Sequence, residues 1–414
     1  MSRALCFLLV QGIVFGANAQ WQLSRSDRAR ELHSEHNDLI SIDAWFDYNA
    51  NSLRNELVSG LWSGSYLDRD LRERTRAVMR ERNSVGYLLG GRVTWVGGDS
   101  VESHVGWRSL MSMAYHEQMG ARFTRDLYAV TFFGNAGYEG RRADLGPTAV
   151  TRIRYQTIGV GMQHARTNSF VRLDFVIGQS YDAADVEWAG MYTGIDGRVI
   201  RATVLGDYYR SDTASSRFGQ VNGFGLAVSG RWETELKRCM NGAHLSLEVE
   251  DLGFASWSGT SQRITKDTII EYGGIEVANI LELDNALIGE DQLLDTFGLR
   301  YRSGSFATLL PFVLRASLRL PMSERWNGSA TVDQRNLPGY LPQLIFAGER
   351  AFGSRTGAGA CLSFGGFGGL RLGAMVRHRI GGRVLLEASS PHLPGFFLGS
   401  ARGAGAMFNA MVAF

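Results

Sequence analysis

The sequence has little net charge, few cysteines and no long apolar run beyond its first residues, and each shortage excludes a class of protein. Its 43 Lys and Arg residues nearly balance its 41 Asp and Glu residues, which leaves a formal charge of +2. We therefore expect no nucleic-acid partner. Three cysteines are too few for a disulfide framework. Because 20% of the residues are charged and the mean hydropathy is −0.11, a bundle of membrane-spanning helices is also excluded.

Residues Met1–Ala19 have the three parts of a secretory signal peptide. Arg3 supplies the positive charge, a nearly unbroken apolar stretch follows, and a small-x-small motif ends at Ala19. The stretch is too short to span a bilayer as a helix. We therefore expect cleavage between Ala19 and Gln20 and a mature protein outside the cytoplasm.

From Val85 to the end of the chain, apolar and polar residues alternate. Leu173 and Phe175, for example, flank Asp174, and such alternation is typical of half-buried strands. We count about fourteen segments (roughly 12–16) of about 8–12 residues, close to the length of a strand that is tilted across a membrane. The sequence therefore predicts an all-β fold, a transmembrane antiparallel β-barrel of about fourteen strands over residues 85–414.

Long cations recur on the polar face of these segments. A barrel of this width encloses more volume than valine and leucine can fill, so the polar face should line the lumen and the apolar face should meet lipid. The residues predicted to line the lumen are Arg152, Arg154, Arg172, Arg201, Arg231, Glu248, Glu250, Arg315 and Arg319. Aromatic residues near segment ends suit the girdles at the two membrane interfaces. These are Trp95, Tyr115, Tyr209, Trp232 and Trp326.

Two stretches depart from the alternation. Residues 20–84 are polar and carry a charged helical pattern at residues 66–82, so we expect a periplasmic or plug segment there. Residues 258–296 are rich in acidic side chains, and Val277–Leu294 could form a short helix. An external loop and a segment folded into the lumen both fit this acidic insert.

The C-terminus carries a separate indication of the membrane. Phe408, Val412 and Phe414 fall on one face of a final amphipathic strand that ends in an aromatic residue. This resembles the signal that the outer-membrane assembly machinery reads. We therefore expect that machinery and outer-membrane lipid among the partners.

Several short motifs resemble a Bacteroidota outer-membrane β-barrel family of unknown function. They include Gly60–Asp68 (GLWSGSYLD), Val249–Phe254 (VEDLGF), Ser305–Pro311 (SFATLLP) and the glycine-rich block Gly357–Gly373. More distantly, the chain is similar to FadL-type channels for hydrophobic compounds and to barrels associated with type IX secretion and gliding. The resemblance implies the bacterial outer membrane and a barrel, without a chemistry. The Asn-Pro-Ala element that many FadL-type proteins carry near the mature N-terminus is missing.

Motifs that would indicate catalysis are absent from the sequence: it has no Gly-x-Ser-x-Gly elbow, phosphate-binding loop or His-Glu-x-x-His pair. His244, Ser246, Glu248 and Glu250 share one face of a strand, but any polar lumen wall would look the same. We interpret the cluster at residues 33–36 (HSEH) as part of a solvated tail. We therefore expect no enzyme, cofactor or metal.

Two further features leave alternatives open. Asp251 and Gly253 mark a switch from polar to apolar residues, which indicates a kink with a lateral exit toward lipid or an ordinary strand end. Cys239 and Cys361 remain after cleavage, and the sequence does not say whether they pair.

Taken together, these patterns predict an outer-membrane barrel that is a channel for small hydrophobic or amphipathic solutes. The alternative is a non-conducting scaffold for a secretion, gliding or surface-assembly complex, with the acidic insert as its docking surface.

Overall fold

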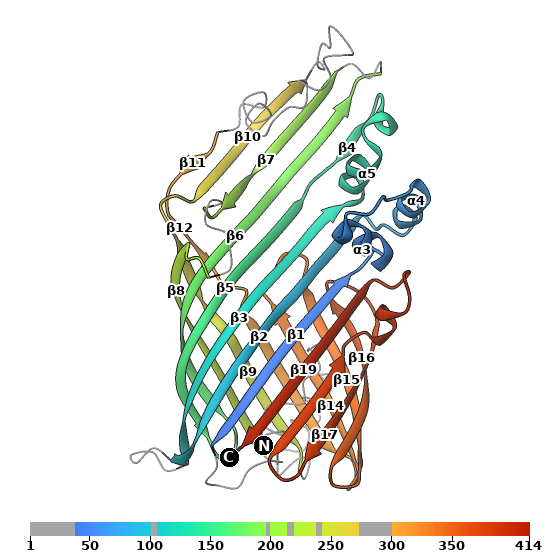
Figure 1. Ribbon diagram of the computed structural model, residues 1–414. Helices are drawn as coiled ribbons and strands as arrows, with labels where there is room; N and C mark the ends of the chain where they lie inside the picture. Colours follow the sequence, from blue (N-terminus) through green and yellow to red (C-terminus); the bar gives the residue numbers. More distant parts are fainter. Residues whose placement is uncertain (1–37, 101–105, 196–198, 213–218, 237–241, 273–299) are drawn as a thin grey trace, which may run out of the picture.

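The computed structural model describes residues 38–100, 106–195, 199–212, 219–236, 242–272 and 300–414 (Figure 1). Within them, nineteen strand segments form one antiparallel sheet, which closes into a barrel of fourteen strands. Closure joins the first strand to the last in an unbroken register from Leu39–Ala413 to Asn49–Gly403. The expected cleavage site at Ala19 and Gln20 lies outside the described residues.

The first half of the barrel contains β1 (Leu39–Ala50), β2 (Arg82–Ser100), β3 (Trp107–Thr124), β4 (Arg142–Asp144), β5 (Thr148–His164), β6 (Phe170–Thr193), β7 (Ile200–Arg210), β8 (Gly223–Glu235), β9 (His244–Trp257) and β10 (Gln262–Tyr272). The second half contains β11 (Arg302–Ser303), β12 (Phe306–Leu309), β13 (Val313–Pro321), β14 (Trp326–Arg335), β15 (Leu341–Phe352), β16 (Thr356–Gly366), β17 (Arg371–Ile380), β18 (Val384–Ser390) and β19 (Gly403–Ala413). The helices are α3 (Asn55–Ser63), α4 (Arg69–Ala77), α5 (Arg125–Phe133), η1 (Ala136–Tyr138) and η3 (Leu393–Phe396).

Four of the fourteen strands are interrupted, which explains the larger number of segments. β4 and β5 both pair with β6 and together make one strand. β7 and β8 also share β6 as a neighbour, at its two ends. β10 continues β9, and β11, β12 and β13 follow one another along β10 and β9. These interruptions bear on the candidate functional site below.

The two ends of the barrel differ. At one end, β6, β7 and β10 extend beyond the rest of the wall, and α3, α4 and α5 lie beside the strand ends (Figure 1). The opposite end holds the C-terminus and short turns, such as the one that joins β17 to β18. No helix in the described part of the chain is long and apolar enough to cross a membrane.

Three expectations about boundaries are wrong in the structure. Residues 20–84 are not wholly a periplasmic or plug segment, because Leu39–Ala50 is a barrel strand with neighbours on both sides. The charged helix is shorter than residues 66–82: α4 ends at Ala77, and β2 already begins at Arg82. In the acidic insert 258–296, Gln262–Tyr272 is strand β10, paired with β7. The helix suggested for residues 277–294 lies outside the described residues.

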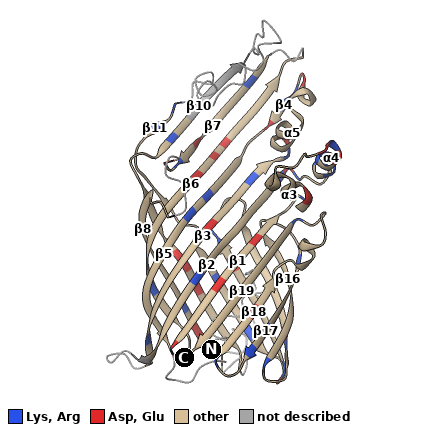
Figure 2. Cartoon of the chain, in the orientation of Figure 1, with Lys and Arg blue, Asp and Glu red and all other residues tan. Residues whose placement is uncertain are grey.

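Over most of the wall, apolar side chains face outward and polar ones face inward, which is the arrangement of a membrane-spanning barrel. On β3, Met111 and Met113 are exposed on the outside, whereas Arg108 and Ser112 are buried inside. Other exposed apolar residues of the outer face are Ile42, Val93, Ile158, Val160, Val171, Leu173, Phe175, Leu226, Leu247, Leu372, Val376 and Phe408. Figure 2 shows basic and acidic positions side by side on neighbouring strands of the wall.

Nearer the helical end, this polarity reverses. On β5, Ile153 and Tyr155 are fully buried inside the barrel, and Arg152 and Arg154 lie on the opposite, outer face. Arg152 donates to Glu117 of β3, which also lies on the outside. An apolar interior under a polar exterior is the arrangement of a water-soluble barrel, so the reversal indicates where the wall leaves the apolar part of the membrane.

Candidate functional site

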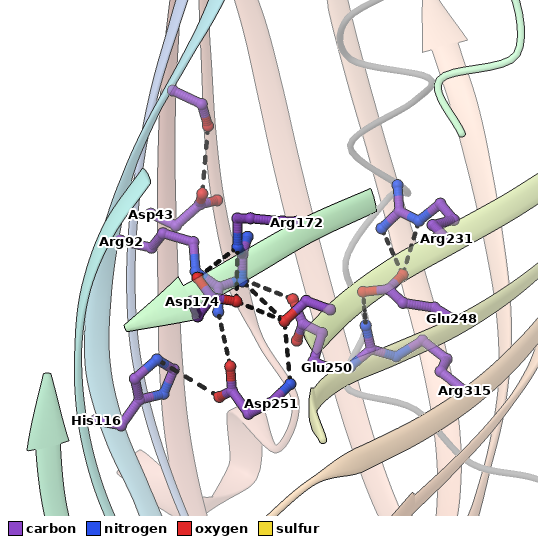
Figure 3. Close-up of polar contacts among 12 residues, drawn as sticks. Asp43, Arg92, His116, Arg172, Asp174, Arg231, Glu248, Glu250, Asp251 and Arg315 are labelled. Carbon is purple, nitrogen blue, oxygen red and sulfur yellow. Dashed lines mark hydrogen bonds and ion pairs between the residues drawn. The ribbon is translucent and has the colours of Figure 1, made fainter. Parts of the chain in front are cut away.

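Charged side chains from distant strands meet inside the lumen and bridge it (Figure 3). Arg92 of β2 lies 2.6 Å from Glu250 and 4.0 Å from Asp251, both on β9. His116 of β3 places its Nε2 atom 3.7 Å from the Asp251 carboxylate. Because β2 and β9 are separated along the wall by several strands, these contacts cross the interior rather than run along it.

Aromatic packing holds the bridge in place. The Tyr155 hydroxyl donates to Asp251 at 2.9 Å and receives a hydrogen bond from Gln118 at 3.2 Å. The Tyr155 ring stacks on His116, with ring centroids 4.7 Å apart, and the Trp45 ring lies 5.6 Å from that of His116. Asp251 therefore has partners from β2, β3 and β5 together.

A second set of ion pairs continues the bridge along the lumen. Glu248 receives hydrogen bonds from Arg231 at 2.6 Å and from Arg315 at 3.1 Å. Arg315 also lies 3.0 Å from Asp333, and the Asp333 carboxylate accepts the Tyr340 hydroxyl at 2.8 Å. Such buried charges are tolerable only when they are paired and hydrogen-bonded.

These contacts leave little free space at their level. A cavity of about 40 Å³ remains among Arg92, His116, Glu250 and their neighbours, enough for a few water molecules at most. Nothing larger than water fits between these particular side chains. A barrel of fourteen strands is wide enough to hold a ligand or an aqueous pore, and at this level ion-paired side chains occupy part of that space.

The wall beside this bridge contains a register shift. On the β8 side, the register shifts between Val228 and Gly230, so that Ser229 faces both Glu250 and Asp251. The N–H group of Asp251 donates to the Ser229 hydroxyl at 3.1 Å. Asp251 has a φ of 54°, in the left-handed region that non-glycine residues adopt uncommonly. This is a β-bulge, which bends a strand and leaves a residue unpaired.

The other edge of β9 is interrupted at the same height. β12 pairs with β9 up to Leu309–Phe254, and β13 resumes only at Val313–Glu250. Between these two pairs, a single backbone hydrogen bond is described across the gap, from the Leu310 N–H to the Gly253 carbonyl at 3.0 Å. Proline at position 311 has no N–H to offer. The segment 251–253 is therefore weakly tied to β12 and β13, whereas on the β8 side only Asp251 leaves the register, and Leu252 and Gly253 stay paired with Val228 and Ala227.

Apolar surface lies on both sides of this break. Inside, Trp257, Ala255 and Leu310 are fully buried in a cluster with Tyr155 and Val176. Outside, an open cavity of about 810 Å³ lies next to the gap, at the level of Leu247–Val249, and its apolar lining also includes Val228 and Leu314. Its lining also includes Arg231, Glu248 and Arg315, so a single strand layer separates it from the charged bridge.

The structure places most, but not all, of the predicted lumen residues inside. Arg172, Arg231, Glu248, Glu250, Arg315 and Arg319 lie on the inner face of the wall. Arg172 is fully buried and donates to Asp174 at 2.7 Å. Asp251 lies at the bulge of β9, and Gly253 lies beside the gap between β12 and β13.

Three of the predicted lumen residues are elsewhere. Arg152 and Arg154 lie on the outer face of β5, in the part near the helical end where the wall has a polar exterior. Arg201 is exposed on β7, in the part of the sheet that extends beyond the closed barrel. Alternation alone cannot say which face is inner once the environment outside changes from lipid to water.

Other expectations concern aromatic and sulfur residues. The Tyr209 ring packs on Phe306 at 5.2 Å, beside the inner apolar cluster. Trp232 and Trp326 are exposed on the outer surface. Cys361 is a buried free thiol, and Cys239 lies outside the described residues. Phe414 is exposed, and its N–H donates to the Asp38 carbonyl.

The sequence interpretation missed Arg92, His116 and Asp333, which carry much of the bridge. Arg92 sits between apolar residues of β2, opposite in face to Leu89 and Val93, so the alternation there could have identified it. No pattern in the sequence shows that it meets Glu250, because that contact depends on closure of the barrel. In the described part of the chain, no His, Cys, Asp and Glu side chains group as metal ligands.

A model described as a family of unknown function (DUF5723) matches residues 102–386, more than half of the chain. A search of curated proteins found no match. Among solved structures, the toluene transporter TodX of Pseudomonas putida is similar at 8% identity and a TM-score of 0.41, over 96% of this chain and 94% of that one. The toluene transporter TbuX of Ralstonia pickettii is similar at 9% identity and 0.39, over 92% and 90%. A mutant porin of Rh. blastica is similar at 10% identity and 0.28, over 91% and 100%.

Proposed function

The chain belongs to the family of unknown function (DUF5723), and we propose that it is an outer-membrane channel for small hydrophobic or amphipathic solutes. In this proposal, solutes leave the barrel sideways, through the wall at Asp251–Gly253. The observation that carries it is the gap in the ladder between β9 and β12–β13 at this segment, beside the bulge at Asp251, with an apolar cluster inside and an apolar outer cavity next to it.

A lateral route suits apolar solutes for a physical reason. The charged bridge around Arg92 and Glu250 crosses the lumen between the apolar cluster and the end of the barrel that holds the C-terminus. A solute that continued along the barrel axis toward that end would have to separate paired, buried charges. A solute that moves from the cluster toward Val228, Val249 and the lipid meets apolar surface instead. Transfer of apolar surface between apolar surroundings carries little penalty, whereas unpairing buried charges is expensive.

The placement in the outer membrane rests on the barrel itself. The exterior is apolar and the interior polar over most of the wall, as in outer-membrane barrels, which also have short turns on the periplasmic side and longer loops outside. The end with the C-terminus and short turns is then periplasmic, and the end with α3, α4 and α5 faces outward.

The test compares two solutes in Gram-negative cells that express the chain and lack their own hydrophobic-compound channel. Uptake of the apolar fluorophore N-phenyl-1-naphthylamine should be faster than in cells with an empty vector. Passage of a polar β-lactam, read by a periplasmic β-lactamase, should stay at the vector level because the bridge leaves only about 40 Å³ of space. Heat-modifiable migration on gels confirms that the barrel is folded.

Faster passage of the polar β-lactam would contradict the bridged lumen. No gain in uptake of either solute by a folded barrel would contradict transport. That second outcome favours the non-conducting scaffold, which the same ion pairs would serve by making the barrel rigid.

A further inference from the structure

An apolar pocket lies outside the barrel, at the rim where α3 meets the wall. It has a volume of about 790 Å³ and lies between α3, the η3 segment and the outer faces of β1 and β2. Phe46 and Val85 line it on the side of the wall, and Val58 and Trp62 of α3 and Phe397 after η3 line it on the opposite side. Its size is in the range of small-molecule sites, and such sites are mostly apolar.

Asn55 joins α3 and η3, which form one side of this pocket, to the barrel wall. The Asn55 amide nitrogen donates to the carbonyls of Gly395 and Gly403 at 2.8 and 3.0 Å, and its oxygen accepts the Gly403 N–H at 2.8 Å. One side chain therefore joins α3 to η3 and to β19. The pocket is built by these contacts and does not depend on a bound molecule to hold it open.

The pocket is continuous with the lipid-facing surface. Phe46 and Tyr87 lie on the same outer faces as Ile42 and Leu89, which are exposed further along β1 and β2. Trp62 and Phe397 are each 78% exposed, although aromatic side chains normally bury most of their surface. In a membrane, the molecules that reach this surface first are lipids, and aromatic residues gather at the level of their headgroups.

Positive charge gathers beside the same pocket. Arg54 precedes Asn55 at the start of α3, and Arg402 precedes Gly403, which Asn55 binds. The hydrogen bonds between Asn55 and Gly403 hold the chain at Arg54 beside the chain at Arg402, and Arg402 donates to the Asn51 carbonyl at 2.9 Å. Burial, and then the positive charges of Arg80 and Arg54, lower the pKa of Arg402. Among the described lining residues, Glu56 is the only acid, and it pairs with Arg54 and Arg74.

We propose that this pocket binds an anionic membrane lipid, with an acyl chain between α3 and the wall and a phosphate group at Arg54 and Arg402, beside the pocket. A phosphate suits these two arginines, since guanidinium groups bind phosphate through charge-assisted hydrogen bonds. The acyl chain covers Phe46, Val58 and Trp62. This site lies on the outer surface and does not depend on whether the lumen conducts.

Native mass spectrometry of the full chain in detergent micelles, titrated with bisphosphorylated lipid A, tests the proposal. The wild-type barrel should retain the lipid. Arg54→Gln with Arg402→Gln should weaken binding by about tenfold or more, as expected for lost charge-assisted contacts. Val58→Trp, which fills the pocket, should weaken binding of both bisphosphorylated and dephosphorylated lipid. Arg355→Gln, in a turn at the opposite end, is the matched control and should bind as the wild type does.

The two kinds of variant separate the two parts of the site. If the double arginine variant and Val58→Trp both bind lipid A as tightly as the wild type, the proposal is wrong. Equal weakening by Arg355→Gln would also overturn it, because binding would then follow total charge. Full competition by inorganic phosphate would show an anion site without a lipid and would contradict the role of the pocket. Loss of a co-purifying protein with unchanged lipid binding would assign the surface to a protein partner instead.

Discussion

Asp251 is the residue on which the lumen and the wall both depend. Its carboxylate accepts the Tyr155 hydroxyl and lies near His116 and Arg92, whereas its backbone N–H binds Ser229. Aspartate tolerates the left-handed backbone conformation better than most residues do. The same residue therefore forms the bulge in β9 and contacts side chains of β2, β3 and β5 across the lumen.

Loss of one charge from this bridge should destabilise the barrel strongly. Arg92→Gln removes the 2.6 Å partner of the half-buried Glu250 and a positive charge 4.0 Å from the buried Asp251, and removing one member of a buried pair costs about 3–5 kcal/mol. Urea unfolding in phospholipid vesicles, followed by tryptophan fluorescence, measures the change. Arg122→Gln is the control: its pair with Asp185 is exposed, and such pairs contribute about 1 kcal/mol or less. Equal stability of the two variants would show that the bridge carries no such energy.

At the scale of elements, β1 and the helices that follow it have different roles, although they are neighbours in the sequence. β1 pairs with β19 and with β2 over nearly its whole length. α3 and α4 lie outside the closed ring, where Leu57 packs with Met79 and Tyr128. A polar N-terminal stretch that looked uniform in sequence thus contains one strand of the wall and a helical cap on its rim.

Deleting these elements should separate their roles. Without residues 39–50, β19 and β2 lose their shared neighbour, and we expect no heat-modifiable, folded barrel. Replacing residues 55–77 with a short glycine-serine linker should leave the barrel closed, because no ladder pair is removed. Gel migration before and after heating distinguishes the two. A folded barrel without β1, or an unfolded one without α3 and α4, would contradict this division.

For the whole molecule, the sequence predicted the barrel, its strand number and the apolar exterior, because alternation records which neighbours each face meets. It could not predict the level at which that exterior turns polar. Arg152 and Arg172 follow the same pattern of alternation, yet one lies outside and the other inside. The contacts of Arg92 with Glu250 and of Arg371 with Asp47 at 2.8 Å join residues far apart in the chain, and only closure of the sheet brings them together.

The most direct test of a lateral route is to block the outer cavity without touching the lumen. Leu314→Trp places a larger side chain in the cavity beside β9, and Leu372→Trp makes the same change at a similarly exposed position on β17. We predict that uptake of N-phenyl-1-naphthylamine falls toward the vector level with Leu314→Trp and stays at the wild-type rate with Leu372→Trp, both barrels being folded. Uptake that is unchanged by Leu314→Trp, or lowered equally by both variants, would contradict passage through the wall at Asp251.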